Sequence, residues 1–401
     1  MSALSTFMPY WDRSRASKGK NYSYEDKDIL IATDFECGSG EEIVKVNDNS
    51  FQMRSETEPG KGHRFEGKST YFCVGLHNKL KKPTRIRLTI LNFTHDLKET
   101  KYITVRRGAD DWYHLPLDDV TPDTDKKELR LDVDLPPFKG SDSVVFLCNF
   151  HWYPYTDMMR YLKKVAEEHP FASLKSIGKT YQGRDIVAIN FGDRARSVPR
   201  LVVAQTPQPS ESGHWSCKSV IDFLTSDDPE AKKVRDRNFI SIIPHTNPDG
   251  TVLGHGMTNS LGQAVFFESY AASEGQEASL ESILMWNYIK DLRPWLFIEY
   301  HSAFQYYRKK NAVFKFDKSL TSDPEVGKLI ERCDGLLDAM PENFTEAVTD
   351  RVNNYTMSMG YAAATKLDVV PYMYKLHDKF PLKENMKQAL KVFRALEGAK
   401  H

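Results

Sequence analysis

Helical patterns alternate with short apolar runs along the second half of the sequence, and this alternation constrains the fold more than any other feature. The run at residues 201–204 is continuously apolar, and those at 239–243 and 296–300 are nearly so. Runs of this kind are typical of strands that are covered on both faces. Their alternation with helices predicts a largely parallel sheet between two helical layers, with any chemistry at the carboxyl ends of the strands.

The helical patterns begin just after Tyr153-Pro154-Tyr155. Thr156 and Asp157 have the character of a helix start, and apolar residues then recur at helical spacing to about residue 169. Further on, the sequence predicts a hairpin at residues 176–191, helices around residues 217–224 and 280–289, and a last helix near residues 386–396.

Residues 28–150 have a different pattern, in which short β-type runs lie between turn residues. The runs are at residues 29–32, 71–76, 86–92, 102–105, 129–133 and 144–150. Runs of this length predict an antiparallel β-sandwich. Since 401 residues also exceed the usual length of one domain, we predict an α/β protein with two domains. The first is an N-terminal antiparallel β-sandwich at residues 1–150, and the second is a mostly parallel α/β/α domain at residues 151–401.

The charge balance and the cysteines bear on partners and location. Lys and Arg total 55 and Asp and Glu total 55, so no whole-molecule field draws the chain to nucleic acid or to an anionic membrane. Residues 1–20 lack the apolar core of a signal peptide, and no later segment reaches membrane-spanning length. The five cysteines are odd in number and widely spread, as for buried thiols in a reducing compartment. We therefore expect a cytoplasmic protein that binds neither nucleic acid nor membrane.

Three segments that follow or close the apolar runs contain the candidate site residues. The segments are 205–214, 245–262 and 299–305, and their polar candidates are Gln208, Glu211, His214, His245, Asp249, His255, Glu299 and His301. Imidazole and carboxylate groups from separate strand ends can converge on a divalent metal that activates water. A single histidine at a strand end is more often a hydrogen-bonded structural residue, so composition alone leaves both interpretations open.

A series of short motifs runs along nearly the whole chain. They are Asp34–Gly38, Tyr153–Thr156, Ile177–Gly178, Gln182–Asp185, Asn247–Gly250 and Glu299–Ser302. In this order and spacing they resemble the cytosolic carboxypeptidase branch of the zinc carboxypeptidase family. The resemblance implies a β-sandwich followed by a carboxypeptidase domain, with zinc as the cofactor. It also implies a peptide or protein tail as substrate or ligand.

The zinc ligands that the resemblance implies are a His-x-x-Glu pair and a later histidine. His301 matches the later histidine. At the pair, Gln208 and Glu211 stand in place of His and Glu, whereas a gapless alignment puts Pro207 and Ser210 there. On either alignment the first histidine is missing, and a neutral amide oxygen is a poor zinc ligand beside imidazole.

Other residues that the resemblance implies also differ in this chain. The arginine that polarises the substrate carbonyl falls near Met257, and the Asn-Arg pair that binds the terminal carboxylate falls near Phe266 and Phe267. These side chains carry no positive charge and cannot bind a carboxylate. The general base falls in residues 372–375, where Tyr374 takes the place next to the expected glutamate. A phenol with a pKa near 10 is almost wholly protonated at neutral pH.

Two alternatives remain for the chemistry of the site. In the first, the protein is a metal-dependent hydrolase with an altered site that cleaves an amide bond. Either Glu211, His214 and His301 form a rebuilt two-His-one-carboxylate zinc site, or His245 or His255 serves as a replacement base or ligand. In the second, the protein is a pseudoenzyme whose cleft binds a peptide tail, a glycan or a partner protein. Aromatic residues near the expected cleft suit the second hypothesis, namely Phe266, Phe267, Tyr270, Phe304, Tyr306, Tyr307, Tyr372 and Tyr374.

Overall fold

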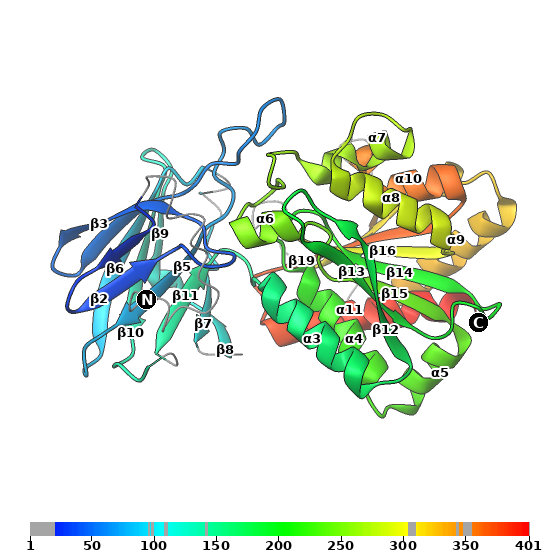
Figure 1. Cartoon of the computed structure of the whole chain (residues 1–401), viewed down its shortest axis with the longest axis horizontal. Helices are drawn as coiled ribbons and strands as arrows, with labels where there is room; N and C mark the ends of the chain where they lie inside the picture. Colours follow the sequence, from blue (N-terminus) through cyan, green and yellow to red (C-terminus); the bar gives the residue numbers. More distant parts are fainter. Residues whose placement is uncertain are drawn as a thin grey trace.

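The computed structural model describes residues 21–94, 97, 100–107, 111–140, 143–303, 310–341, 345–347 and 355–400. They form a β-sandwich and an α/β domain that lie side by side along the long axis of the molecule (Figure 1). The prediction of an α/β protein with an N-terminal sandwich is confirmed. The signal-peptide prediction concerns residues 1–20, which lie outside the described residues.

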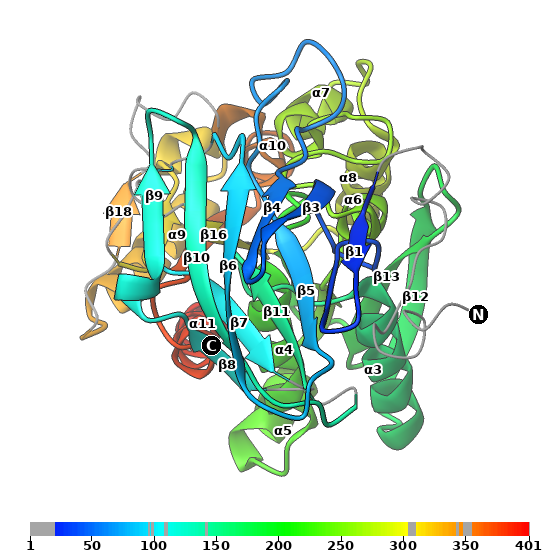
Figure 2. The same ribbon diagram turned by 90° about the vertical axis from the view of Figure 1, so that its left-hand side faces the viewer.

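Two sheets make up the sandwich, and Figure 2 shows them from the side of the molecule on which they lie. Their strand orders are β1-β2-β5-β11-β7-β8 and β3-β4-β6-β10-β9. The bounds are β1 (Ser23–Glu25), β2 (Ile29–Ala32), β3 (Glu41–Asn47), β4 (Ser50–Arg54), β5 (Cys73–Asn78), β6 (Thr84–Leu91), β7 (Thr104–Arg107), β8 (Asp111–His114), β9 (Val120–Asp123), β10 (Glu128–Leu135) and β11 (Val144–Cys148). In β10, Leu129, Leu131 and Val133 are buried between the sheets. Arg130 and Asp134 alternate with them and face solvent, which gives the strand its one apolar face.

The predicted runs lie on β2, β5, β6, β7, β10 and β11. β3 shows why other strands were missed, because it opens with two glutamates and exposes Val44 and Val46 by 47% and 54%. No apolar face marks such a strand in the sequence. The sheets are antiparallel as predicted except at one place, where β4 and β6 run parallel.

One mixed sheet forms the centre of the second domain. Its strand order is β12-β13-β15-β14-β16-β19-β17-β18. The bounds are β12 (Ala172–Lys179), β13 (Asp185–Phe191), β14 (Arg200–Gln205), β15 (Phe239–Ile243), β16 (Leu296–Ala303), β17 (Ala312–Lys315), β18 (Thr345–Ala347) and β19 (Val370–His377). The central strands β15, β14, β16 and β19 run parallel, whereas β13 and β17 are antiparallel to their inner neighbours. The parallel arrangement that the apolar runs predict therefore holds at the centre of the sheet, and β17 and β18 form a further parallel pair at one edge.

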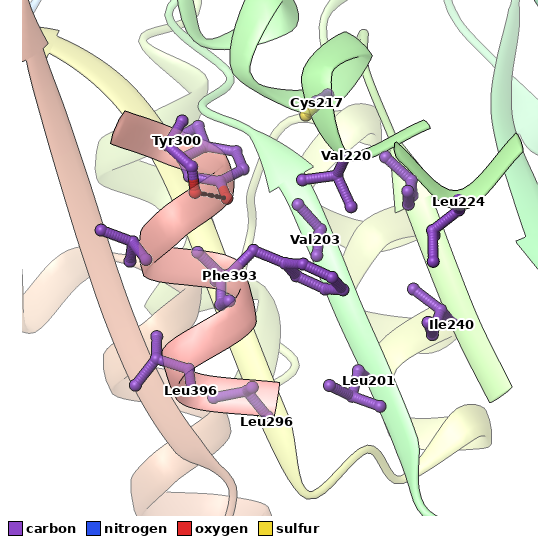
Figure 3. Close-up of a cluster of buried hydrophobic side chains, with 14 of the residues drawn as sticks. Leu201, Val203, Cys217, Val220, Leu224, Ile240, Leu296, Tyr300, Phe393 and Leu396 are labelled. Carbon is purple, nitrogen blue, oxygen red and sulfur yellow. Dashed lines mark hydrogen bonds between the residues drawn. The ribbon is translucent and has the colours of Figure 1, made fainter. Parts of the chain in front are cut away.

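Helices cover both faces of this sheet (Figure 1). They are α3 (Tyr155–Glu168), α4 (Gly213–Thr225), α5 (Pro229–Arg237), α6 (Pro248–Leu253), α7 (Ser269–Ser273), α8 (Leu280–Leu292), α9 (Pro324–Asp338), α10 (Met359–Leu367) and α11 (Leu382–Glu397). On one face, Val203 of β14 packs with Val220 of α4 and Phe393 of α11, as Figure 3 shows. On the other face, Val202 and Phe297 pack with α8 and α10. Among the described helices, none is both long enough and apolar enough to cross a membrane.

Candidate functional site

The loop that follows β14 carries Glu211 to the carboxyl end of the neighbouring strand β16. Parallel pairing places Gln205 beside Tyr300, and the backbone N–H of Thr206 donates to the Tyr300 carbonyl at 2.9 Å. Helix α4 begins at Gly213, so close to β16 that a Cβ at this position would lie 2.2 Å from the Tyr300 carbonyl oxygen. Only glycine fits this approach, which brings Glu211 against the end of β16.

Glu211 and His301, two of the predicted zinc ligands, are in contact at this edge of the sheet. Glu211 Oε2 lies 3.2 Å from His301 Nδ1 and accepts a hydrogen bond from the Ser302 backbone N–H at 2.7 Å. Glu299 Oε2 lies 3.4 Å from the other ring nitrogen of His301, Nε2. The side chains of Glu211 and His301 are fully buried. Two ligands of one tetrahedral zinc lie roughly 3.3 Å apart, so this pair has the spacing of two zinc ligands.

Several polar atoms of this cluster have no hydrogen-bond partner within the described part of the chain. They are Glu211 Oε1, Glu299 Oε2 and both ring nitrogens of His301. A buried polar atom without a partner costs roughly 1–3 kcal/mol, and native structures contain few of them. The cluster is therefore the part of this edge that most needs a functional explanation.

Gln208, another predicted ligand from the same loop, faces a methionine. Its Nε2 lies 3.0 Å from the Sδ of Met257, and its Oε1 lies 3.5 Å from the hydroxyl oxygen of Thr206. Met257 is itself buried. The amide is thus held by uncharged partners, and its oxygen is a weaker zinc ligand than imidazole.

The β-sandwich fixes Met257 in this position through Glu58. The buried carboxylate of Glu58 accepts hydrogen bonds from the backbone N–H groups of Gly256 and Met257 at 2.8 and 3.1 Å. It also accepts from the hydroxyls of Thr258 and Thr70 at 3.0 and 2.7 Å. Burial raises the pKa of Glu58 above its ordinary value, against the effect of these hydrogen bonds. A residue of the first domain therefore sets the shape of the site in the second.

An aromatic wall closes the site beside His301. The ring of Phe266 lies edge-on to the His301 ring, with centroids 5.2 Å apart, and Phe267 packs against Phe266 at 5.0 Å. The cavity next to Glu299 has a volume of about 10 Å³, which is close to the minimum for one water. The predicted cleft residues Phe304, Tyr306 and Tyr307 lie outside the described residues.

Strand β19 places Tyr374 away from this cluster. Its register pairs Tyr300 with Tyr374 and His301 with Lys375. Because side chains alternate between the faces of a sheet, Tyr374 lies opposite to His301, and its ring packs 5.8 Å from that of Tyr300 in the core. Lys375 shares the face of His301, and its Nζ lies 5.3 Å from the ring centroid of Tyr355. The position of Tyr374 argues against the catalytic role that we predicted for it.

His214 and His245 lie together at the junction with the linking segment, residues 149–154, which connects the two domains. His214 Nε2 is 3.0 Å from the carbonyl oxygen of His151, and its ring lies 5.5 Å from that of His245. Burial lowers the pKa of His214 well below its ordinary value and lowers that of His245 to about 3. His255 Nδ1 lies 3.0 Å from the carbonyl oxygen of Asn259. These contacts involve neither Glu211 nor His301.

The donor set at this edge does not fit a catalytic zinc ion. Across the described residues, no group of three or more His, Cys, Asp or Glu side chains is placed to hold a metal. A catalytic zinc needs three protein ligands and an open position for water. Glu211 and His301 supply two ligands that are closed from solvent, while Gln208 offers only a neutral amide.

Glu299, Lys375 and Glu58 also contribute to the site, but the sequence indicates some of them better than others. Glu299 stands two residues before His301, so strand alternation places both on one face. Lys375 follows from the same alternation once the register of β19 is known. Glu58 carried no signal, because about 200 residues separate it from the loop that it holds.

Comparisons with known proteins agree with this geometry at the level of family and fold. A family model described as zinc carboxypeptidase matches residues 158–264. Cytosolic carboxypeptidase 2 from Macaca fascicularis is 24% identical over 259 residues, which cover 58% of this chain and 30% of the relative. Its human counterpart is 23% identical over 258 residues, covering 58% of this chain and 28% of the relative. The chain thus spans less than a third of these relatives.

Solved structures show the same fold over nearly the whole chain. A metallo-carboxypeptidase from Burkholderia cenocepacia has a TM-score of 0.75 at 18% identity, covering 93% of this chain and 99% of that one. A metallo-carboxypeptidase from Pseudomonas aeruginosa, in complex with (2-guanidinoethylmercapto)succinic acid, has a TM-score of 0.74 at 18% identity, with coverage of 92% and 98%. At this identity the likeness shows the fold alone. This chain therefore has the metallo-carboxypeptidase fold, and the zinc carboxypeptidase model matches it over residues 158–264.

Proposed function

We propose that the carboxypeptidase-like function of this chain is binding without hydrolysis. The observation that carries the proposal is the contact between Gln208 and Met257 next to the buried pair of Glu211 and His301. Hydrolysis through a metal-activated water needs three protein ligands and an open position on the metal. At the place of the third ligand this chain has an uncharged amide against a thioether, so the metal that the family match implies would be held weakly.

Two more side chains support loss of the metal chemistry. Lys375 lies on the neighbouring strand, on the same face of the sheet as His301. Its positive charge would repel a metal cation bound at Glu211 and His301. Phe266 packs edge-on to the His301 ring. A substrate carbonyl would have to displace this ring to approach the pair.

The ligand class that we propose is a peptide or protein tail, bound at the rim of the site because the cavity beside Glu299 holds no more than about one water. The family match and the fold support this class, because a carboxypeptidase engages the end of a peptide chain. At the rim, Arg64 lies over the rings of Phe65 and Phe267, with its guanidinium carbon 5.2 and 5.7 Å from their centroids. Aromatic rings beside a guanidinium suit a peptide with apolar and acidic groups.

A cytoplasmic location belongs to the same proposal. The five cysteines are free and buried, which agrees with a reducing compartment. The relatives named above are called cytosolic.

Zinc analysis and an amidase assay test the proposal together. We expect protein purified without chelator to contain much less than one zinc per chain and to show no amidase activity that depends on His301. Stoichiometric zinc, with hydrolysis that disappears in His301→Ala, would show that the protein is an enzyme.

A gain-of-function variant sharpens this test. Gln208→His adds an imidazole three residues before Glu211, which completes a set of three ligands with His301. We expect zinc affinity to rise more than about 100-fold, since even partners outside the ligand shell change it 10–100-fold. Gln276→His, at an exposed position, is the matched control and should leave affinity unchanged. Equal affinities in the two variants would mean that position 208 does not limit metal binding.

A further inference from the structure

A pocket at the junction of the two domains lies apart from the cluster of Glu211 and His301. Its volume is about 310 Å³, and its walls come from β7, the linking segment, α3 and α4. The lining residues are Arg106, Tyr153, Pro154, Asp157, Arg160, Tyr161, Lys164 and Trp215. Small-molecule sites typically have volumes of about 300–1,000 Å³ and often lie between domains. This pocket is thus large enough for a small ligand, whereas the cavity beside Glu299 is not.

The charge of the lining selects an anionic ligand. Three of its side chains are cationic and one is anionic, which gives the lining residues a net formal charge of +2, and Lys164 Nζ also lies 3.8 Å from the exposed carboxylate of Glu168. Arg160 and Lys164 are one helical turn apart on α3 and face the same way. Arg160 Nη1 lies 2.8 Å from Asp157 Oδ1, but the arginine is 68% exposed, and exposed pairs of this kind rearrange at little cost. A phosphate monoester, with a charge of about −1.5 to −2 at neutral pH, complements this lining.

The rings of the lining select a ligand with a flat apolar part. Tyr153 and Trp215 pack with ring centroids 4.5 Å apart. The hydroxyl of Tyr161 donates to Asp222 Oδ1 at 2.6 Å, which fixes the orientation of its ring. Nucleobases stack on aromatic side chains of this kind whatever their sequence. Lys218 Nζ lies 4.5 Å from the centroid of the Tyr161 ring and covers one of its faces, so a ligand in the pocket would stack on the other.

We propose that this pocket binds a nucleoside monophosphate, with the phosphate at Arg106, Arg160 and Lys164 and the base against Tyr153 and Tyr161. A single phosphate and a single ring system match the size of the pocket, whereas an acidic peptide needs a longer groove. The proposal is independent of whether the site at Glu211 and His301 hydrolyses anything.

Calorimetric titration of the full chain with adenosine monophosphate tests the proposal. We expect saturable binding at one site, and at least tenfold weaker binding of adenosine and of inorganic phosphate, because each supplies half of the contacts. Inorganic phosphate that binds as tightly as the nucleotide, or no saturation by the nucleotide at millimolar concentration, would overturn it. Tighter binding of a tetraglutamate peptide would assign the pocket to acidic peptides and would overturn it equally.

Two lysines on α3 provide a matched pair of variants. Lys164 lines the pocket, while its neighbour Lys163 is exposed and does not. Lys164→Gln should weaken nucleotide binding about tenfold, as expected for the loss of a hydrogen bond to a charged group. Lys163→Gln makes the same charge change on the same helix and should have less than a twofold effect. If the two variants weakened nucleotide binding equally, a general attraction between charges would account for the binding, and the proposal would be overturned.

Discussion

His245 is a residue whose protonation is set by burial. Its ring is buried at the start of the loop after β15, beside the ring of His214. Burial lowers the pKa of His245 from 6.5 to about 3. The imidazole is therefore neutral in the folded protein over the physiological range, and it is a hydrogen-bonding group rather than a charge.

Acidification should destabilise the fold through this histidine. Because its folded-state pKa is depressed, the unfolded chain binds more protons below about pH 6.5, so the free energy of unfolding falls as the pH drops from about 6.5 towards about 3. The slope for one such group is about 1.4 kcal/mol per pH unit. Urea denaturation across this range should show a shallower pH dependence for His245→Asn than for the wild type. His63→Asn, in a loop of the sandwich, is the control, and a wild-type slope in His245→Asn would contradict the prediction.

The place of a residue in the fold could be predicted where a motif fixed it, but not where the register of a strand decided it. The strand-end motifs of the sequence put Glu211 and His301 at one edge, where the structure brings them into contact. Tyr374 was predicted by matching residues 372–375 to the segment in which the resemblance implies a general base. The register of β19 instead places Tyr374 in the core and Lys375 on the face of His301. Registers depend on hydrogen bonds between distant strands, which no local pattern in the sequence records.

At the scale of elements, the contact between α4 and β16 positions the site. The helix begins at Gly213, and its first turn lies directly against the carbonyl of Tyr300. The same turn holds Ser212, whose backbone N–H donates to the Ser302 hydroxyl at 2.8 Å. The distance between Glu211 and His301 therefore depends on how closely this helix approaches this strand.

Gly213→Ala should separate the two elements. The added Cβ would lie 2.2 Å from a backbone oxygen, which cannot move as a flexible side chain can. We expect a loss of about 3 kcal/mol in the free energy of unfolding, at the upper end of the usual range for overpacking. Gly335→Ala, within α9, makes the same substitution with nothing within 4 Å of the new Cβ. It should stabilise the protein by roughly 0.5–1 kcal/mol through helix propensity, and a similar loss in both variants would contradict our account.

Elements were predicted well where their apolar faces are complete. The centre of the sheet follows from the apolar runs of β14, β15 and β16, which are buried on both faces. Edge and surface strands such as β3 carry exposed valines and leading glutamates, so their sequences lack a periodic signal. The fold class could thus be derived from the core strands, while marginal strands such as β3, β17 and β18 could not.

At the scale of the whole molecule, the β-sandwich helps to set the shape of the site. Besides the hydrogen bonds of Glu58, two backbone approaches join the domains. A Cβ on Gly60 would lie 2.1 Å from the carbonyl oxygen of Gly262, and one on Gly254 would lie 2.0 Å from that of Gly38. Contacts this close fix the loop of residues 254–262 against the first domain. The position of Met257, and with it the contact that Gln208 makes, therefore depends on both domains.

Glu58→Ala tests this coupling. The substitution leaves three buried donors of the 256–258 loop without their acceptor, at roughly 1 kcal/mol or more for each, so we expect a loss of about 3 kcal/mol in the free energy of unfolding. Hydrogen exchange in residues 256–262 should quicken, because these amides lose protection when the loop detaches from the sandwich. Glu66→Ala, on the same sandwich loop but exposed, is the control and should change stability by less than about 0.5 kcal/mol. If Glu58→Ala lowered stability without faster exchange in this loop, its role would be confined to the sandwich, and the site in the second domain would keep its shape without the first.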